Sequence, residues 1–249
     1  MSNDSLQLAC RFSLPPNSLG YCGQNSAPEK FKKCVVNGIS VGDLQEIQQE
    51  LERFIVLNPY LETLATLTGK SKFSRQVIEA YWLGNDELTK AKPEDYFLLL
   101  VNFANQGVPP WFVDDLRLKL PKKFIPHHLF QVLHVGVGRA SGSVPFDMSS
   151  INNCMIRWGK VTRIMGDTLE ADLTLLDGKI GDGSANDKTF SSLKLSQKIC
   201  QVVFLLGFLP NLKLGDVVAV HWGQAVKILS PKEVAQLDFW TRKVLDSLA

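Results

Sequence analysis

The stretch CMIRWGKV occupies residues 154–161, and GDVVAVHWG follows at residues 215–223. Both are rich in apolar and β-branched residues, and Gly-Asp at the start of the second is a turn signal. We expect two strands of one small β-barrel, the first running over residues 154–164. The two stretches bring the Cys154 thiol and the His221 imidazole into a single domain, and this pair is the main functional clue in the sequence.

The rest of the second half has the pattern of short strands followed by one helix. Further strands are expected at residues 168–176, 189–195, 199–206 and 225–229. Ser230, Pro231 and Glu233 form a helix-start signature, with Ser230 as the N-cap. Residues 151–249 are therefore predicted to form a small OB-like β-barrel with a C-terminal helix, because closure of a sheet removes its exposed edges.

The first half has a helical period instead, and the fold class is therefore α+β. Residues 1–145 are predicted to form a helical domain, because apolar side chains recur there at three- and four-residue spacing. Residues 136–150 are rich in Gly, Ser and Pro and are expected to be a linker. Residues 1–9 show no clear pattern. Pro15 and Pro16 predict an extended segment that ends in a turn.

Composition and charge narrow the classes of function. The chain has 249 residues, 45% of them hydrophobic, and a net charge of +2. This near-neutral charge, without a dense Lys/Arg field, argues against a nucleic-acid partner. The longest apolar runs are far too short to span a bilayer, so no membrane partner is expected. Five cysteines at irregular spacing do not form a disulfide framework, and no leader pattern is seen, so we expect a cytoplasmic protein with free thiols.

Other candidate site residues lie in the first half. Cys22 is flanked by two glycines that let backbone approach it closely, so it is either a metal ligand or nucleophile, or a loop thiol that packs as a small apolar group. His127 and His128 belong to the segment PHHLFQVLH at residues 126–134. His127 and His134 are seven residues apart, whereas metal-binding pairs on one helix more often use a spacing of four, so the histidines of this segment are either site residues or hydrogen-bonded core groups.

One motif runs through the second half. Cys154 is followed by Gly159 and Lys160 with the spacing C-x4-G-K, and LGDVVAVHWGQA precedes the expected final helix. Through these residues, positions 152–245 resemble the hydrogenase maturation factor HypC (HupF) family of barrel chaperones in nickel–iron hydrogenase assembly. The resemblance implies that Cys154 and His221 hold or contact an iron–cyanide–carbonyl fragment. It also implies the hydrogenase large subunit or maturation proteins as partners.

The whole chain is also similar to an uncharacterised bacterial two-domain family. The shared segments are PPNSLGYCG at residues 15–23 and EAYWLGN at residues 79–85.

The chemistry that the HypC resemblance implies suits these residue types. A low-spin iron fragment suits a soft thiolate, with an imidazole as second ligand or hydrogen-bond donor. The thiol must lose its proton to bind. On an alternating strand that starts at Cys154, Lys160 would share the face of the thiol, so Lys160 is expected to lower the pKa of Cys154.

These observations give one leading function and two alternatives. The leading hypothesis is an accessory or chaperone protein in hydrogenase assembly, in which the barrel binds an iron fragment or a maturation partner and the helical domain recognises the client. One alternative is a structural protein-interaction module without metal. The other is a thiol- or metal-dependent enzyme that uses Cys22 with His127 or His128. The sequence has no G-x-S-x-G, phosphate-loop or Cys-x-x-Cys motif, so a non-enzymatic role is expected.

Overall fold

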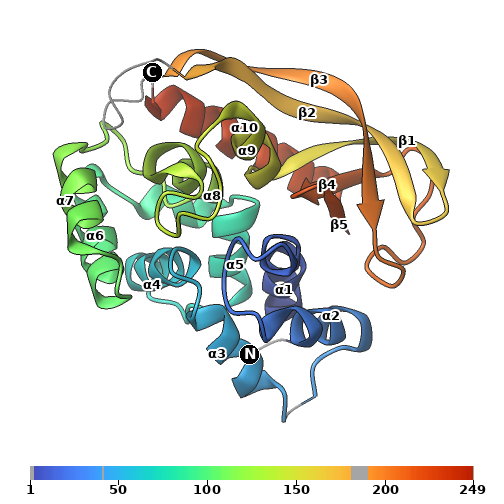
Figure 1. Ribbon diagram of the computed structural model, residues 1–249, viewed down its shortest axis with the longest axis horizontal. Coiled ribbons are helices and arrows are strands. Elements are labelled where there is room, and N and C mark those ends of the chain that lie inside the picture. Colours follow the sequence, from blue (N-terminus) through green and yellow to red (C-terminus); the bar gives the residue numbers. More distant parts are fainter. Residues whose placement is uncertain (1–2, 41, 181–189, 249) are drawn as a thin grey trace.

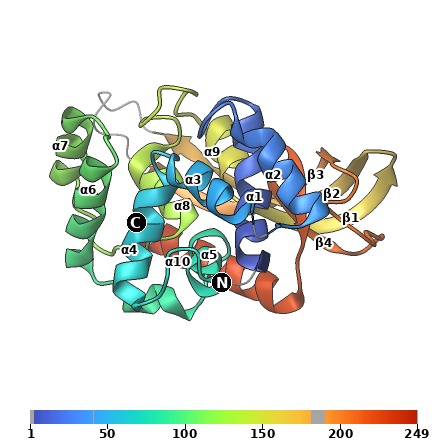
Figure 2. The same cartoon turned by 90° about the horizontal axis from the view of Figure 1, so that it is seen from below.

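The computed structural model describes residues 3–40, 42–180 and 190–248, and it has a helical N-terminal part, a five-stranded mixed sheet and a C-terminal helix (Figure 1). The helices before the sheet are α1 (Asn3–Ser18), α2 (Ala27–Asn37), α3 (Leu44–Glu52), α4 (Leu57–Thr68), α5 (Arg75–Trp82), the 3-10 helices η1 (Asp86–Lys90) and η2 (Pro93–Asp95), α6 (Tyr96–Asn105), α7 (Pro110–Leu118), α8 (His128–Phe130), the π-helical turn η3 (Gln131–Gly136) and α9 (Met148–Cys154). In both views, α6 and α7 lie at one end, the strands lie at the other, and α1, α5 and α8 lie between them (Figure 2).

The strands pair in a closed order, β1-β2-β3-β5-β4, with β4 returning to β1. They are β1 (Arg157–Met165), β2 (Thr168–Ile180), β3 (Phe190–Phe204), β4 (Val217–His221) and β5 (Gln224–Ile228), and the last helix is α10 (Pro231–Leu248). All the pairs are antiparallel except β3 with β5. Gly159 allows the close approach of β1 to β2, because a Cβ there would lie 1.9 Å from the Asp172 carbonyl oxygen.

The structure corrects two of the predicted strand boundaries. The strands expected at residues 189–195 and 199–206 form the single strand β3, which pairs with β2 along most of its length; residue 189 lies outside the described part of the chain. The predicted strand at residues 154–164 is also wrong at its start, because Cys154 ends α9 and β1 begins at Arg157. Helix α9 is fixed by tertiary contacts. The side-chain amide of its Asn152 donates to the Leu176 carbonyl in β2 and accepts from the Leu176 backbone N–H.

The N-terminal segment is helical rather than extended. Helix α1 runs from Asn3 to Ser18 and contains Pro15 and Pro16 in its last turn. Its apolar face explains why it folds, because Leu6 and Phe12 are fully buried. Tertiary burial outweighs the local cost of the two prolines, each of which lacks the N–H that would bond to the carbonyl four residues earlier.

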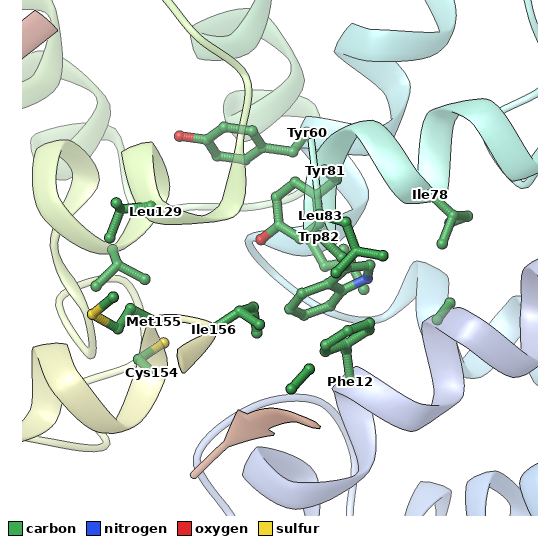
Figure 3. Packing of buried hydrophobic residues seen from close by; sticks show 14 of the residues in the cluster. Phe12, Tyr60, Ile78, Tyr81, Trp82, Leu83, Leu129, Cys154, Met155 and Ile156 are labelled. Atoms are coloured by element: carbon green, nitrogen blue, oxygen red, sulfur yellow. The ribbon is translucent and has the colours of Figure 1, made fainter. Parts of the chain in front are cut away.

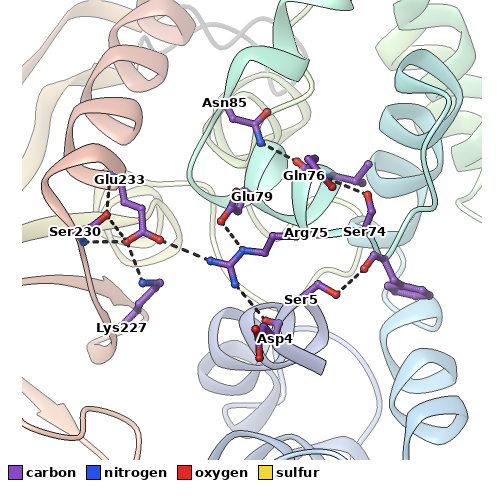
Figure 4. Close-up of polar contacts among 12 residues, drawn as sticks. Asp4, Ser5, Ser74, Arg75, Gln76, Glu79, Asn85, Lys227, Ser230 and Glu233 are labelled. Atoms are coloured by element: carbon purple, nitrogen blue, oxygen red, sulfur yellow. Dashed lines mark hydrogen bonds and ion pairs between the residues drawn. The ribbon is translucent and has the colours of Figure 1, made fainter. Parts of the chain in front are cut away.

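One apolar core contains buried side chains from both halves of the chain. The predicted division into residues 1–145 and 151–249 stays a prediction, and the packed core crosses it. At the surface of this junction, Arg75 bonds to Glu79, lies 3.8 Å from Glu233 of α10, and donates to the Asp4 carbonyl at 3.4 Å (Figure 4). Half-exposed ion pairs contribute at most about 1 kcal/mol each, so apolar packing dominates the stability of the junction.

The predicted start of the final helix is confirmed. The Ser230 hydroxyl accepts from the backbone N–H of Glu233 at 3.3 Å, and the Glu233 carboxylate accepts from the backbone N–H of Ser230 at 2.9 Å. Across the described ranges of the chain, no helix has the length and apolar character needed to cross a membrane.

Candidate metal centre

Three side chains with metal-ligating atoms meet where the helical part packs against the sheet. His128 begins α8, Cys154 ends α9 and His221 ends β4. One ligand atom from each lies within 4.8 Å of the other two, and all three residues are buried. Cys154 Sγ is 3.8 Å from His128 Nε2. Figure 3 shows Cys154 beside Met155, on the side of the core opposite the aromatic side chains of Tyr81 and Trp82.

His221 has one bonded and one unbonded ring nitrogen. Its Nδ1 is 2.6 Å from the carbonyl oxygen of Phe12, so Nδ1 carries the proton and donates the bond. That carbonyl is available because Pro16, four residues further along α1, has no N–H to donate to it. Within the described residues Nε2 has no hydrogen-bond partner, although the side chain is only 1% exposed. A buried, unpaired imidazole nitrogen beside a thiol offers the lone pair that a metal ion requires.

The surroundings of His221 keep its imidazole neutral. Burial lowers the pKa of His221 well below its usual range, and the nearby His128 and Arg157 lower it further. The Phe12 carbonyl, which accepts the bond from Nδ1, opposes this shift only in part. A neutral imidazole is the form in which histidine binds metals, so His221 is ready to act as a ligand.

His128 is held by a bond at each ring nitrogen. Its Nε2 is 2.8 Å from the Cys154 carbonyl oxygen and its Nδ1 is 3.0 Å from the Tyr81 hydroxyl. A carbonyl only accepts, so these partners assign the proton to Nε2, and the Tyr81 hydroxyl donates to Nδ1. The Cys154 carbonyl is available because it belongs to the last turn of α9, where carbonyls lack helical partners. Burial lowers the pKa of His128 to about 4, so this imidazole is also neutral.

The Cys154 thiol is protonated in the absence of a metal. Burial raises the pKa of this thiol well above its usual value, negative charge on Cys22 would raise it further, and the Trp222 indole N–H lowers it in part. The expectation that Lys160 lowers this pKa rested on a shared strand face, and that geometry is wrong because Cys154 belongs to α9. Lys160 is exposed on β1. A metal ion must therefore displace the Cys154 proton itself.

The turn that follows His221 has an unusual backbone. Trp222 and Gly223 join β4 to β5, with φ angles of +48° and +73°. Such a turn suits hairpins, but a bulky residue with positive φ costs about 1–3 kcal/mol. Two contacts hold Trp222 there: its backbone N–H donates to the Asn153 carbonyl at 2.7 Å, and its ring packs 4.6 Å from that of Tyr21. Strain of this kind is concentrated at functional sites.

A pocket of about 360 Å³ opens onto the three ligating side chains. Cys22 also lines it, so the structure brings this predicted residue to the same place as Cys154, His221 and His128. Cys22 is exposed, unlike the other three. Burial of its thiol between the pocket walls nevertheless raises the pKa of Cys22 to about 12. Apart from the histidines, Arg53 is the one charged residue among the described lining residues, and aromatic rings and backbone form much of the wall.

Two further candidates from the sequence lie elsewhere. His127 is the N-cap of α8, where its Nδ1 accepts from the backbone N–H of Leu129 at 3.1 Å. Lys160 is exposed and lies beside Gly215 at the surface of the sheet. Tyr81 and Trp82, which no sequence motif marked as site residues, also lie at the cluster of metal-ligating side chains. The ring of Trp82 is 4.5 Å from that of His128 and 5.6 Å from that of His221.

Together, the fold and the site define a mixed helical and β-sheet protein with a buried thiol–imidazole cluster that faces a pocket. The chain belongs to a family of unknown function (DUF6390), whose model matches residues 1–249. No curated protein and no solved structure matches it.

Proposed function

We propose that the protein is an accessory protein of nickel–iron hydrogenase assembly that holds an iron fragment between His128, Cys154 and His221. The observation that carries this proposal is the convergence of their ligand atoms within 4.8 Å, with an unpaired nitrogen on His221. One thiolate and two imidazoles suit iron, zinc and similar borderline metals. The HypC-like motif selects iron among them, as a cargo that is bound and passed on. In this proposal the barrel is of the OB-like kind and the protein acts in the cytoplasm.

The pocket fits a cargo that brings ligands of its own. Three protein donors leave coordination positions open on a metal ion, as in sites that exchange or transform what they bind. The pocket of about 360 Å³ gives room for small ligands in those positions. Its walls contain several aromatic rings, and the three donors at its inner end are buried.

The proposed client, the hydrogenase large subunit or another maturation protein, would bind at the far end of the helical part. There α6 and α7 lie at the edge of the molecule (Figure 2). Both helices have large apolar side chains that are exposed to solvent. Trp111 is 66% exposed and Leu118 is 86% exposed, and Phe97 and Val101 of α6 are also exposed. Grouped exposed apolar residues of this size are typical of protein-interaction surfaces.

A second candidate function is a metal-dependent enzyme. The observation that favours it is that Cys22 and His128 line one pocket. A metal ion with an open position can polarise a substrate or activate a water molecule there. A third reading, a structural module without metal, requires that the three buried donors serve packing alone.

Metal analysis and infrared spectroscopy separate these functions. The full-length protein is purified without oxygen from cells that make nickel–iron hydrogenase, together with Cys154→Ala, His221→Ala and the control His134→Gln. We expect bound iron with CO and cyanide bands in the wild type and the control, and loss of both in the two site variants. Iron or zinc without these bands favours the enzyme. Metal-free wild-type protein contradicts the proposal.

A further inference from the structure

Cys22 lies in the pocket wall, but it differs from the three inner donors in its access to solvent. Cys22 is exposed, whereas Cys154, His128 and His221 are buried. All four line the same pocket. The pocket therefore connects an exposed thiol with the three buried donors.

The backbone around Cys22 is held firmly in place. The Asn17 side-chain amide donates to the Cys22 carbonyl at 2.6 Å and to the Gln24 carbonyl at 3.0 Å. Gly23, with φ of +77°, lies against Phe54 so closely that a Cβ would be 2.5 Å from the ring. The loop is thus fixed to α1 on one side and to Phe54 on the other, and the Cys22 thiol stays at the pocket.

The same loop is joined to the hairpin that carries His221. Tyr21 packs its ring 4.6 Å from that of Trp222, the residue after His221. The Ser143 hydroxyl donates to the Tyr21 carbonyl at 3.1 Å. At the inner end of the pocket, the buried Nε2 of His221 has no partner among the described residues, so its lone pair is available to bind an ion.

We infer that Cys22 is an exchangeable metal ligand, through which a thiophilic divalent ion enters and leaves the centre of His128, Cys154 and His221. This inference rests on the proposed metal centre and adds its route of loading and release. On release, the Cys22 sulfur loses its proton and binds the ion, while the Cys154 sulfur leaves the ion and takes up a proton. The oxidation state of the ion does not change, so the exchange needs no oxidant or reductant.

Cobalt(II) exchange in the full-length protein tests this inference. Thiolate-to-cobalt charge-transfer absorption reports binding, and transfer to a chelator reports release. Cys22→Ser is compared with the wild type and with Cys200→Ser, a half-buried thiol of β3 that serves as the matched control. We expect Cys22→Ser to slow both loading and release by about tenfold, the scale of effects from single residues that support metal sites, with little change in affinity. The control should keep wild-type rates.

Three results overturn the inference. Wild-type rates in Cys22→Ser exclude a role for this thiol. Faster release with lost affinity shows a fixed fourth ligand instead of an exchanging one. If the wild type binds no cobalt, both the metal centre and the role of Cys22 are wrong.

The same experiment separates the two proposals. Cobalt binding with charge-transfer bands that require Cys154 supports the metal centre, even when Cys22→Ser has wild-type rates.

Discussion

His134 and His221 both lie among aromatic side chains, but their ring nitrogens differ in the hydrogen bonds that they form. His134 stacks on Phe130, and its Nε2 bonds to the Tyr96 hydroxyl at 3.1 Å. His221 bonds through Nδ1 to the Phe12 carbonyl, and its buried Nε2 has no hydrogen-bond partner among the described residues. Burial lowers the pKa of both. The contrast shows that burial and a lowered pKa do not mark a ligand, whereas an unsatisfied nitrogen beside a thiol does.

The largest expected effect on metal affinity comes from removing a proposed ligand. We expect Cys154→Ala and His221→Ala to lower the affinity for Co²⁺ or Zn²⁺ by more than about a hundredfold, beyond the losses seen for supporting residues. His134→Gln should bind metal like the wild type while its melting temperature falls. Isothermal titration with each ion, paired with thermal unfolding, measures both quantities. Equal metal affinity in all three variants would remove the distinction between the two histidines.

The pH dependence of metal binding should separate thiol from imidazole. His128, with a pKa of about 4, and His221 are already neutral near pH 7, whereas the pKa of Cys154 is raised and its proton must be displaced. Affinity should therefore rise with pH, by about tenfold per pH unit for each thiol proton released. Titrations in buffers of different ionisation enthalpy count these protons. An affinity that is flat between pH 6 and 8 would show that no thiol ligates.

The tyrosine hydroxyls that bond to His128 and His134 offer a smaller test. For Nε2 of His128 to bind a metal, its proton must move to Nδ1, which then donates to the Tyr81 oxygen. Tyr81→Phe leaves that N–H buried without an acceptor, so metal affinity should fall by about tenfold. Tyr96→Phe removes the equivalent contact of His134 and serves as the control. A competition assay with a coloured chelator gives both affinities, and equal values would argue against His128 as a ligand.

The smallest expected effect concerns the turn beside His221. Gly223 and Gly166 both have positive φ, and a Cβ at either position meets open space. Alanine at each site should therefore cost about 1–2 kcal/mol of unfolding free energy from backbone strain alone. Only Gly223→Ala should also weaken metal binding, because it disturbs the hairpin that positions His221. Denaturant unfolding and metal titration of both variants decide this, and a matching affinity loss in Gly166→Ala would refute it.

Local patterns in the sequence predicted the parts of the fold that local patterns control. The β-branched run of β4, the capping box at Ser230 and the helical period of the first half all predicted the correct element. Helix α1 was missed because burial of residues such as Phe12 outweighs Pro15 and Pro16. Helix α9 was missed because the bonds of Asn152 to β2 are tertiary.

The candidate site was predictable only in part, for the same reason. Cys154 and His221 stood out through their motif, but their closeness to His128 and Tyr81 depends on how α5, α8 and α9 pack. No spacing along the chain reveals a contact between Tyr81 and His128, which are 47 residues apart. Pro16 was the available signal for the bonding of His221, since a proline in a helix frees the carbonyl four residues before it.

X-ray absorption spectroscopy of the zinc- or iron-loaded full-length protein tests the central claim most directly. If the metal is held by His128, Cys154 and His221, the spectrum contains sulfur at about 2.3 Å and imidazole nitrogen at about 2.0–2.1 Å for zinc. The sulfur shell disappears in Cys154→Ala, and the imidazole signal weakens in His221→Ala. A first shell of oxygen alone, or a spectrum unchanged in both variants, would contradict the proposed centre.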